Sequence, residues 1–163
     1  MTTPRPRTMT IRTESRIVVA GSVRDVWDYL CDVGRWAEWA PTVLECRVRG
    51  GRPLETGAII EQRARDFRTE HRRIERVTVV EAPHAMAFAG TIGSSPARWG
   101  MEVLPAGEDS TDAIMWVEAD LRNVMRVIPG GILRRRIQRT SDIEMAAIKA
   151  AVEADVQAGA GSP

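Results

Sequence analysis

The chain has 163 residues, of which 44% are hydrophobic and 28% are charged, and its net charge is +1 at pH 7. This length suits one domain with its own core, and the near-neutral charge argues against nucleic acid as a partner. No stretch reaches the roughly 18 apolar residues of a membrane span, and the N-terminus lacks the apolar segment of a secretory signal. We therefore expect a cytoplasmic protein with no membrane span. The single lysine, Lys149, among many arginines indicates a GC-rich, bacterial coding sequence.

Both ends of the chain differ in composition from its middle. Residues 1–9 are rich in proline, arginine and threonine, and residues 157–163 are mostly small. Such segments cannot bury enough apolar surface to become ordered, so both are predicted to be disordered tails. No linker or internal repeat interrupts the stretch between them. Residues 10–156 are therefore predicted to form one domain.

A strand and two short helices are predicted at the start of this domain. Residues 10–19 end in a β-branched run that is typical of a strand. A serine can cap the following helix over residues 23–32, in which apolar residues recur at helical spacing. A second short helix is predicted over residues 35–39. Its two tryptophans, Trp36 and Trp39, are three residues apart and share one face.

The rest of the chain changes to strands and then to one long helix. Short connections rich in glycine and proline favour an antiparallel meander. The last element carries an apolar stripe at helical spacing, which must be buried against the sheet. The predicted strands are residues 43–49, 58–65, 69–81, 86–92, 98–104 and 113–121. The final helix is predicted to begin or bend at residues 129–131.

Residues spread along the predicted domain carry a resemblance to a known family. They are Ile17 to Ser22, Val26-Trp27-Asp28, Asp32, Trp36, Trp39, Pro41, Gly57, Val80 to Pro83, Leu104-Pro105, Ser110-Thr111, Ile148-Lys149 and Glu153. In this order they resemble the START-like helix-grip superfamily (SRPBCC), in particular its polyketide cyclase/dehydrase-type members. The resemblance implies an α+β fold in which a curved antiparallel sheet of about seven strands wraps around a long C-terminal helix. It also implies an internal cavity for a hydrophobic small molecule and no cofactor.

Apolar side chains on the inner surfaces of this fold are expected to contact the ligand. In proteins of this fold the short helix with Trp36 and Trp39 flanks the pocket, and we expect Trp39 to lie at its mouth. Trp99 lies on an apolar strand face, where it belongs either to the core or to the cavity wall. The predicted ligand-binding residues are Trp36, Trp39, Met86, Phe88, Trp99, Met101, Met115, Val117, Leu133, Ile137 and Ser141.

Two charged residues of the predicted strand 58–65 are candidates for catalysis. Glu61 and Arg63 share one face, and two interpretations of them stay open. They either form a solvated ladder with Glu70, Arg72 and Glu75 across the hairpin, or they enter the cavity. Inside the cavity Glu61 could act as a general acid or base and Arg63 could hold an oxyanion.

The chain departs from its apparent relatives at two places. Aromatase/cyclase members of the superfamily generally place an arginine and a tyrosine inside the pocket. The corresponding positions here are near Val79-Val80 and Val43, and both are apolar. No metal-binding pattern and no nucleophile–histidine pattern is present. A cavity can still catalyse by positioning a reactive substrate and excluding water.

Three functions remain open at this point. The first is a cofactor-free cyclase or dehydratase that acts on a polyketide-like or other secondary metabolite. It requires a titratable pair inside the cavity, drawn from Glu61, Arg63, Glu102 and Glu144. The second is a non-catalytic carrier or sensor of a lipid-like ligand, which a wholly apolar cavity would favour. The third is a protein-interaction module, which a collapsed cavity and an exposed Trp116 would favour. An exposed Trp116 would also favour a homodimer.

Overall fold

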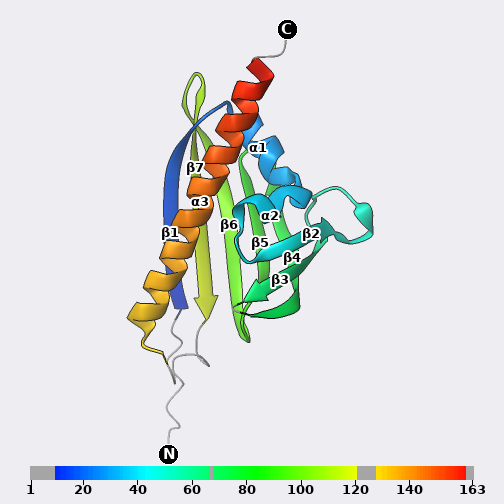
Figure 1. Cartoon of the computed structure of the whole chain (residues 1–163), viewed down its shortest axis with the longest axis vertical. Coiled ribbons are helices and arrows are strands. Elements are labelled where there is room, and N and C mark those ends of the chain that lie inside the picture. Colours follow the sequence, from blue (N-terminus) through cyan, green and yellow to red (C-terminus); the bar gives the residue numbers. More distant parts are fainter. Residues whose placement is uncertain (1–9, 67, 121–127, 161–163) are drawn as a thin grey trace, which may run out of the picture.

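One curved antiparallel sheet and a long C-terminal helix make up most of the described structure (Figure 1). The computed structural model describes residues 10–66, 68–120 and 128–160. Within these residues the elements are β1 (Thr10–Ala20), α1 (Val23–Cys31), the 3-10 turn η1 (Val33–Arg35), α2 (Trp36–Trp39), β2 (Val43–Val48), the 3-10 turn η2 (Arg49–Gly51), β3 (Ile59–Asp66), β4 (Thr69–Glu81), β5 (Ala85–Ile92), β6 (Ser95–Gly107), β7 (Ser110–Asp120) and α3 (Gly130–Ala160). The strands lie in the order β1-β7-β6-β5-β4-β3-β2. The predicted α+β helix-grip fold is confirmed.

The ends of the domain differ in part from the sequence prediction. Helix α3 continues to Ala160, so the first four residues of the predicted tail 157–163 are helical. Alanine has the best helix propensity and is frequent here, which accounts for the extension. Residues 1–9 and 161–163, the hairpin residue Phe67 and the predicted strand end at Leu121 lie outside the described residues.

Helix α1 begins at the serine cap that the sequence predicts, and Asp25 completes a capping box there. The Ser22 hydroxyl accepts a hydrogen bond from the Asp25 backbone N–H at 3.2 Å, and the Asp25 carboxylate accepts one from the Ser22 N–H at 2.8 Å. These bonds satisfy two backbone donors that the first turn of a helix leaves unpaired. The helix then buries Val26, Trp27 and Leu30 against the sheet, so Trp27 is a core residue.

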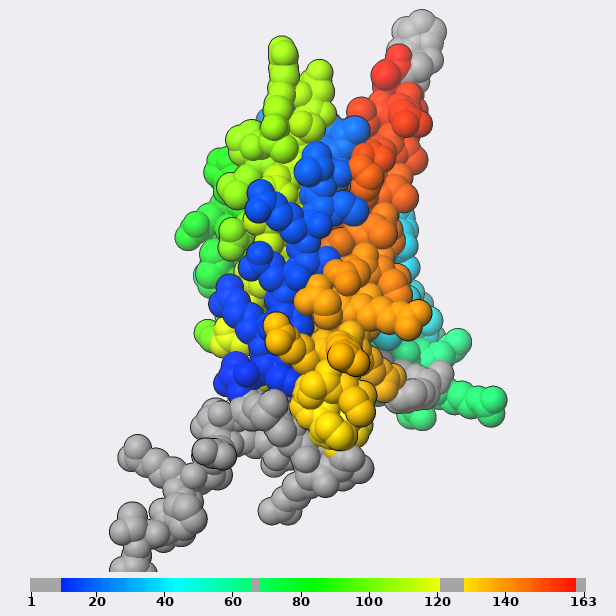
Figure 2. Space-filling view, turned by 90° about the vertical axis from the view of Figure 1, so that its left-hand side faces the viewer, coloured from blue at the N-terminus to red at the C-terminus, as the bar shows by residue number. Residues whose placement is uncertain are grey.

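Helix α3 crosses one face of the sheet beside β1, and both views show the two elements in contact along much of their length (Figures 1 and 2). Side chains of α3 also bond to the backbone of β1, which is an edge strand. Three such bonds are Gln138 Nε2 to the Glu14 carbonyl at 2.8 Å, Lys149 Nζ to the Val18 carbonyl at 2.7 Å, and the Ala20 N–H to the Glu153 carboxylate at 2.8 Å. The helix therefore covers an edge that would otherwise expose unpaired backbone groups.

The core between sheet and helices consists of two clusters. The larger one joins α1, α2 and the C-terminal half of α3 to the middle of the sheet. The smaller one contains Ile11, Ala97, Ala119 and Leu133, near the beginning of α3. Residues of both clusters line one cavity, which therefore lies where the packing of α3 on the sheet is incomplete.

The outer face of the sheet has a close contact at Gly100. Trp116 points outward from β7, as its alternation with buried Met115 predicts, but its ring packs over Gly100 and under Arg12 and is partly buried. A Cβ on Gly100 would lie 2.6 Å from both the Met86 carbonyl oxygen and the Trp116 ring.

We therefore expect Gly100→Ala to destabilise the protein by about 1–3 kcal/mol, because the added methyl meets backbone that cannot move aside. The matched control is Gly131→Ala, where an added Cβ meets nothing within 4 Å. Urea unfolding of both variants and the wild type measures the effect. Equal stability of the two variants would contradict the contact at Gly100.

Candidate functional site

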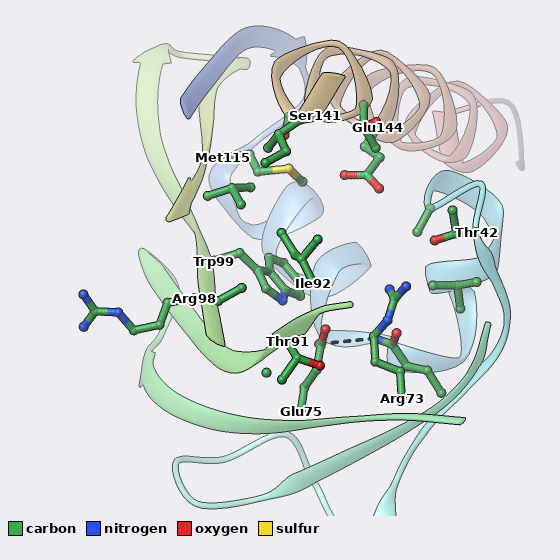
Figure 3. A pocket seen from close by; sticks show the side chains of 18 of the residues that line it. Thr42, Arg73, Glu75, Thr91, Ile92, Arg98, Trp99, Met115, Ser141 and Glu144 are labelled. Carbon is green, nitrogen blue, oxygen red and sulfur yellow. Dashed lines mark hydrogen bonds between the residues drawn. The ribbon is translucent and has the colours of Figure 1, made fainter. Parts of the chain in front are cut away.

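A cavity of about 450 Å³ lies between the sheet, α2 and the first half of α3. This volume is within the range of about 300–1,000 Å³ that is usual for small-molecule sites. Figure 3 shows side chains from both layers pointing into the space. The walls are mostly apolar, and a few polar groups converge from β3, β4 and α3.

The structure brings most of the predicted ligand-binding residues to this cavity. Those that line it are Trp36, Trp39, Trp99, Met115, Val117, Leu133, Ile137 and Ser141. Met86, Phe88 and Met101 do not line it, and the prediction of direct contact is corrected for these three. They point toward the same side of the sheet but are fully buried in the larger core cluster. The Trp99 ring stacks on the Phe88 ring at 4.2 Å, so Trp99 lies at the surface of the cavity and Phe88 does not.

Aromatic rings form one wall of the cavity. The centroid of the Trp36 ring is 5.6 Å from that of Trp39 and 5.4 Å from that of Trp99. Edge-to-face and stacked pairs at such distances add to the stability gained from burial. The rings are therefore held in place by one another, and the wall that a ligand meets is preformed.

The entrance does not lie at Trp39, contrary to the sequence-based expectation. Trp39 is only 5% exposed. The exposed residues of the cavity lining lie instead at the end of β5, at Thr91 and Ile92, at Gly93 of the following turn, and on α3 at Arg136. Arg98 also belongs to the lining but points away from the cavity in Figure 3.

Glu61 and Arg63 lie on the outer face of β3 and do not line the cavity. Glu61 pairs with Arg47 and Arg49, at 2.9 and 2.7 Å. Arg63 pairs with Glu45 at 2.6 Å and also with Glu70. Their proposed entry into the cavity is corrected, because the alternation of the strand turns Gln62 inward and its two neighbours outward. Glu102 is likewise exposed and outside the cavity lining.

The polar groups inside the cavity come partly from residues that sequence reasoning missed. Gln62 and Glu75 are buried on the inner face, and Gln62 Nε2 donates to Glu75 Oε2 at 3.2 Å. Arg73, two residues before Glu75 on β4, also lines the cavity. From the sequence, Glu75 is a possible member of the outer ladder, but it lies two residues before the buried Val77 and so shares its inward face. That parity was the signal available in the sequence.

Glu144 projects from α3 toward the space above Arg73 and Glu75 (Figure 3). Burial raises the pKa of Glu144 to about 7, and the nearby Glu75 charge raises this pKa further while Arg73 opposes the rise. Burial also raises the pKa of Glu75, but Arg73 and a hydrogen bond from Trp99 act in the opposite direction. Glu144 was among the titratable candidates from the sequence, and it is the one that reaches the cavity.

Of the two apolar positions at which aromatase/cyclases carry polar residues, Val43 belongs to the cavity lining, whereas Val79-Val80 do not. Val43 keeps its part of the wall apolar. The positions near Val79-Val80 are apolar, as the sequence indicates, but Arg73 brings an arginine to the cavity from elsewhere on this strand.

The described residues 10–66, 68–120 and 128–160 contain no cluster of histidine, cysteine, aspartate and glutamate side chains suited to hold a metal ion. Over the same residues no helix is long and apolar enough to cross a membrane.

Comparisons with known proteins agree with this fold and cavity. A sequence model described as polyketide cyclase / dehydrase and lipid transport matches residues 10–153, so the chain belongs to this family of the START-like superfamily. No curated protein matches the chain.

Several solved structures resemble the chain at low sequence identity. A START superfamily protein from Mycobacterium smegmatis is 17% identical with a TM-score of 0.70, over 88% of this chain and 97% of that one. The Zhui aromatase/cyclase from a Streptomyces species is 15% identical with a TM-score of 0.76, over 94% and 100% of the two chains. Norcoclaurine synthase from Thalictrum flavum is 18% identical with a TM-score of 0.64, over 91% and 97%. At such identities the likeness supports the fold alone.

The raised pKa of Glu144 predicts how stability depends on pH. Since this pKa lies near 7 in the folded chain and near 4.5 in the unfolded chain, the folded state binds more protons between these values. Stability should therefore fall as pH rises from about 5 to about 7.5, by roughly 1–3 kcal/mol. Glu144→Gln should flatten this decline and make the variant more stable than the wild type at pH 8. In this variant stability should still fall somewhat with rising pH, because the pKa of Glu75 is also raised in the folded chain.

Unfolding by urea at several pH values between 5 and 8 measures this effect. Glu61→Gln is the matched control, because its arginine partners lower the pKa of Glu61 and its titration lies below this range. A slope in Glu144→Gln equal to that of the wild type would show that Glu144 titrates normally.

Proposed function

We propose that the protein binds a hydrophobic small molecule, polyketide-like or from another class of secondary metabolite, and acts on it as a cofactor-free cyclase or dehydratase. The observation that carries this proposal is the pair of carboxyl groups, Glu75 and Glu144, inside a mostly apolar cavity. Membership of the polyketide cyclase / dehydrase and lipid transport family supports the ligand class.

A binding site for an apolar ligand does not need buried carboxyl groups. Removing an ionised carboxylate from water costs several kcal/mol unless it is compensated. A leucine or methionine at position 144 would fill the same space without that cost. Perturbed carboxyl groups facing one cavity are typical of acid–base catalysis, so the pair favours an enzyme over a passive carrier.

The environments of the two carboxyl groups assign them different protonation states. Glu75 accepts a hydrogen bond from Gln62. Arg73 and Trp99 act to lower the pKa of Glu75 against the effect of burial, so the ionised form is stabilised and Glu75 serves as the general base. Burial raises the pKa of Glu144 to about 7, with Glu75 adding to the rise and Arg73 opposing it, so Glu144 keeps its proton up to about pH 7 and serves as the general acid. Arg73 lies near both and stabilises negative charge that develops on a substrate oxygen.

The proposed dehydration step follows from these roles. Glu75 removes a proton from the carbon next to a substrate carbonyl, and the electron pair forms an enolate whose oxygen Arg73 stabilises. The enolate then expels the β-hydroxyl group, which takes the proton of Glu144 and leaves as water. A proton passes from Glu75 to Glu144 through solvent to restore the starting state. Cyclisation uses the same groups, with the enolate carbon attacking a second carbonyl that Glu144 protonates.

The predominantly apolar and aromatic wall keeps a non-catalytic carrier or sensor as the second candidate. An interaction module is disfavoured, since the cavity is not collapsed and Trp116 is covered by Arg12 and packed on Gly100. The homodimer, the absence of nucleic-acid binding and the cytoplasmic location stay predictions.

Turnover of a synthetic poly-β-ketone thioester, followed by mass spectrometry as loss of water, tests the proposal. We expect the rate to fall as pH rises through about 7, because Glu144 loses the proton that it must donate. Glu144→Gln and Glu75→Gln should each lower the rate about a hundredfold or more. Glu61→Gln, whose carboxylate lies on the outer face of the sheet, should retain the wild-type rate.

The same compound must also be tested for binding, by quenching of tryptophan fluorescence. Saturable binding without any turnover above the uncatalysed rate would reject the enzyme and support the carrier. Full activity in both glutamine variants would reject the assigned acid and base.

A further inference from the structure

Two buried polar atoms in the cavity wall have no hydrogen-bond partner among the described residues. They are Trp39 Nε1, a donor, and Gln62 Oε1, an acceptor. Both side chains are 5% exposed and both line the cavity. A buried polar group left unpaired costs about 1–3 kcal/mol, so such groups are rare and call for an explanation. A ligand in the cavity can supply both missing partners.

The three tryptophans of the wall differ in whether their indole N–H has a partner in the protein. The Trp36 indole N–H donates to the Leu30 backbone carbonyl at 2.9 Å. The Trp99 indole interacts with the Glu75 carboxylate and lowers the pKa of Glu75. Trp39 has the same chemistry and lies against both of these rings, yet its N–H has no protein acceptor. Because neighbouring rings hold Trp39 in place, its donor cannot easily turn toward another partner.

The free acceptor on Gln62 follows from its bond to Glu75. The amide nitrogen donates to the Glu75 carboxylate at 3.2 Å. The reversed amide would set two oxygen atoms against each other when Glu75 is ionised, so this orientation is preferred. The amide oxygen is then left without a donor. A ligand that pairs with it must bring an N–H or O–H group.

We propose that the ligand of this cavity is a mostly apolar molecule that carries a carbonyl acceptor for Trp39 and a hydroxyl donor for Gln62. The two residues thus determine specificity. Water can pair with both atoms in the empty cavity, whereas a hydrocarbon or an acyl chain that displaces this water leaves both unpaired. A hydroxylated aromatic ketone leaves neither unpaired. The inference rests on the proposed binding of a small molecule in the cavity, but it does not require catalysis.

Four naphthalene compounds separate the two contacts. They are 6-acetyl-2-naphthol with both groups, 2-acetylnaphthalene with the acceptor, 2-naphthol with the donor, and naphthalene with neither. The dissociation constant, measured by tryptophan quenching at pH 7, should be lowest for the compound with both groups and highest for naphthalene. The two compounds with one group should lie between them, and each hydrogen bond should lower the constant roughly two- to tenfold. The wild-type series alone tests the inference, without any variant that must fold.

Two variants assign the contacts to their residues. Trp39→Phe should abolish the preference for 2-acetylnaphthalene over naphthalene while it keeps the preference for 2-naphthol. Gln62→Leu should abolish the preference for 2-naphthol over naphthalene while it keeps the preference for 2-acetylnaphthalene. Trp36→Phe is the matched control, since the N–H that it removes is used by Leu30, and it should keep both preferences whatever its effect on the absolute affinities.

The outcomes distinguish this inference from the proposed function. Equal affinities for all four compounds in the wild type would overturn the inference and leave binding of an apolar ligand intact. A preference that persists in both Trp39→Phe and Gln62→Leu would overturn the assignment to these residues. Failure of all four compounds to bind would overturn the inference and the proposed small-molecule site together.

Discussion

The docking of α3 on the sheet is the interaction on which the rest of the structure depends. Its side chains satisfy the exposed backbone of edge strand β1, through Gln138, Lys149 and Glu153. The same docking closes the cavity and holds Glu144 over it. An undocked α3 would leave an unpaired strand edge, an open sheet face and a glutamate with an ordinary pKa. Fold and candidate chemistry therefore depend on the same contact.

The cavity arises because the inner face of α3 changes character along its length. In the C-terminal half, Met145, Ile148 and Val152 fill the space against the sheet and are almost completely buried. In the N-terminal half, Ser141 is too short to do so and Glu144 is polar. A well-packed core leaves few voids larger than a water molecule, so a void of this size reflects side chains that do not fill it. The well-packed C-terminal half of α3 stabilises the docking of the helix, and this offsets the poorer packing of the N-terminal half around the cavity.

More of the fold than of the candidate site could be predicted from the sequence. Element order, capping at Ser22 and the apolar stripe of α3 depend on local spacing, which the sequence displays directly. The wall residues on β7 and α3 follow from the same periodicity. Charge alone does not decide between a solvated ladder and the cavity for Glu61 and Arg63, whereas the alternation of the strand turns Gln62 inward and Glu61 outward. The pairing of Glu75 with Gln62 depends on the register of β3 with β4 and on sheet curvature, which no local pattern encodes.

Direct titration of the side-chain carboxyl groups tests the central claim, which is that two carboxyl groups of different protonation state share one apolar cavity. Nuclear magnetic resonance of protein labelled with ¹³C at glutamate carboxyl groups follows each titration, and Glu75→Gln and Glu144→Gln assign the two signals. The account predicts one carboxyl with a pKa near 7, belonging to Glu144, and a pKa for Glu75 that is raised above its ordinary value. It also predicts that the Glu144 pKa falls when Glu75 is replaced by glutamine. Titration of both groups near 4.5, the ordinary value for glutamate, would contradict the account.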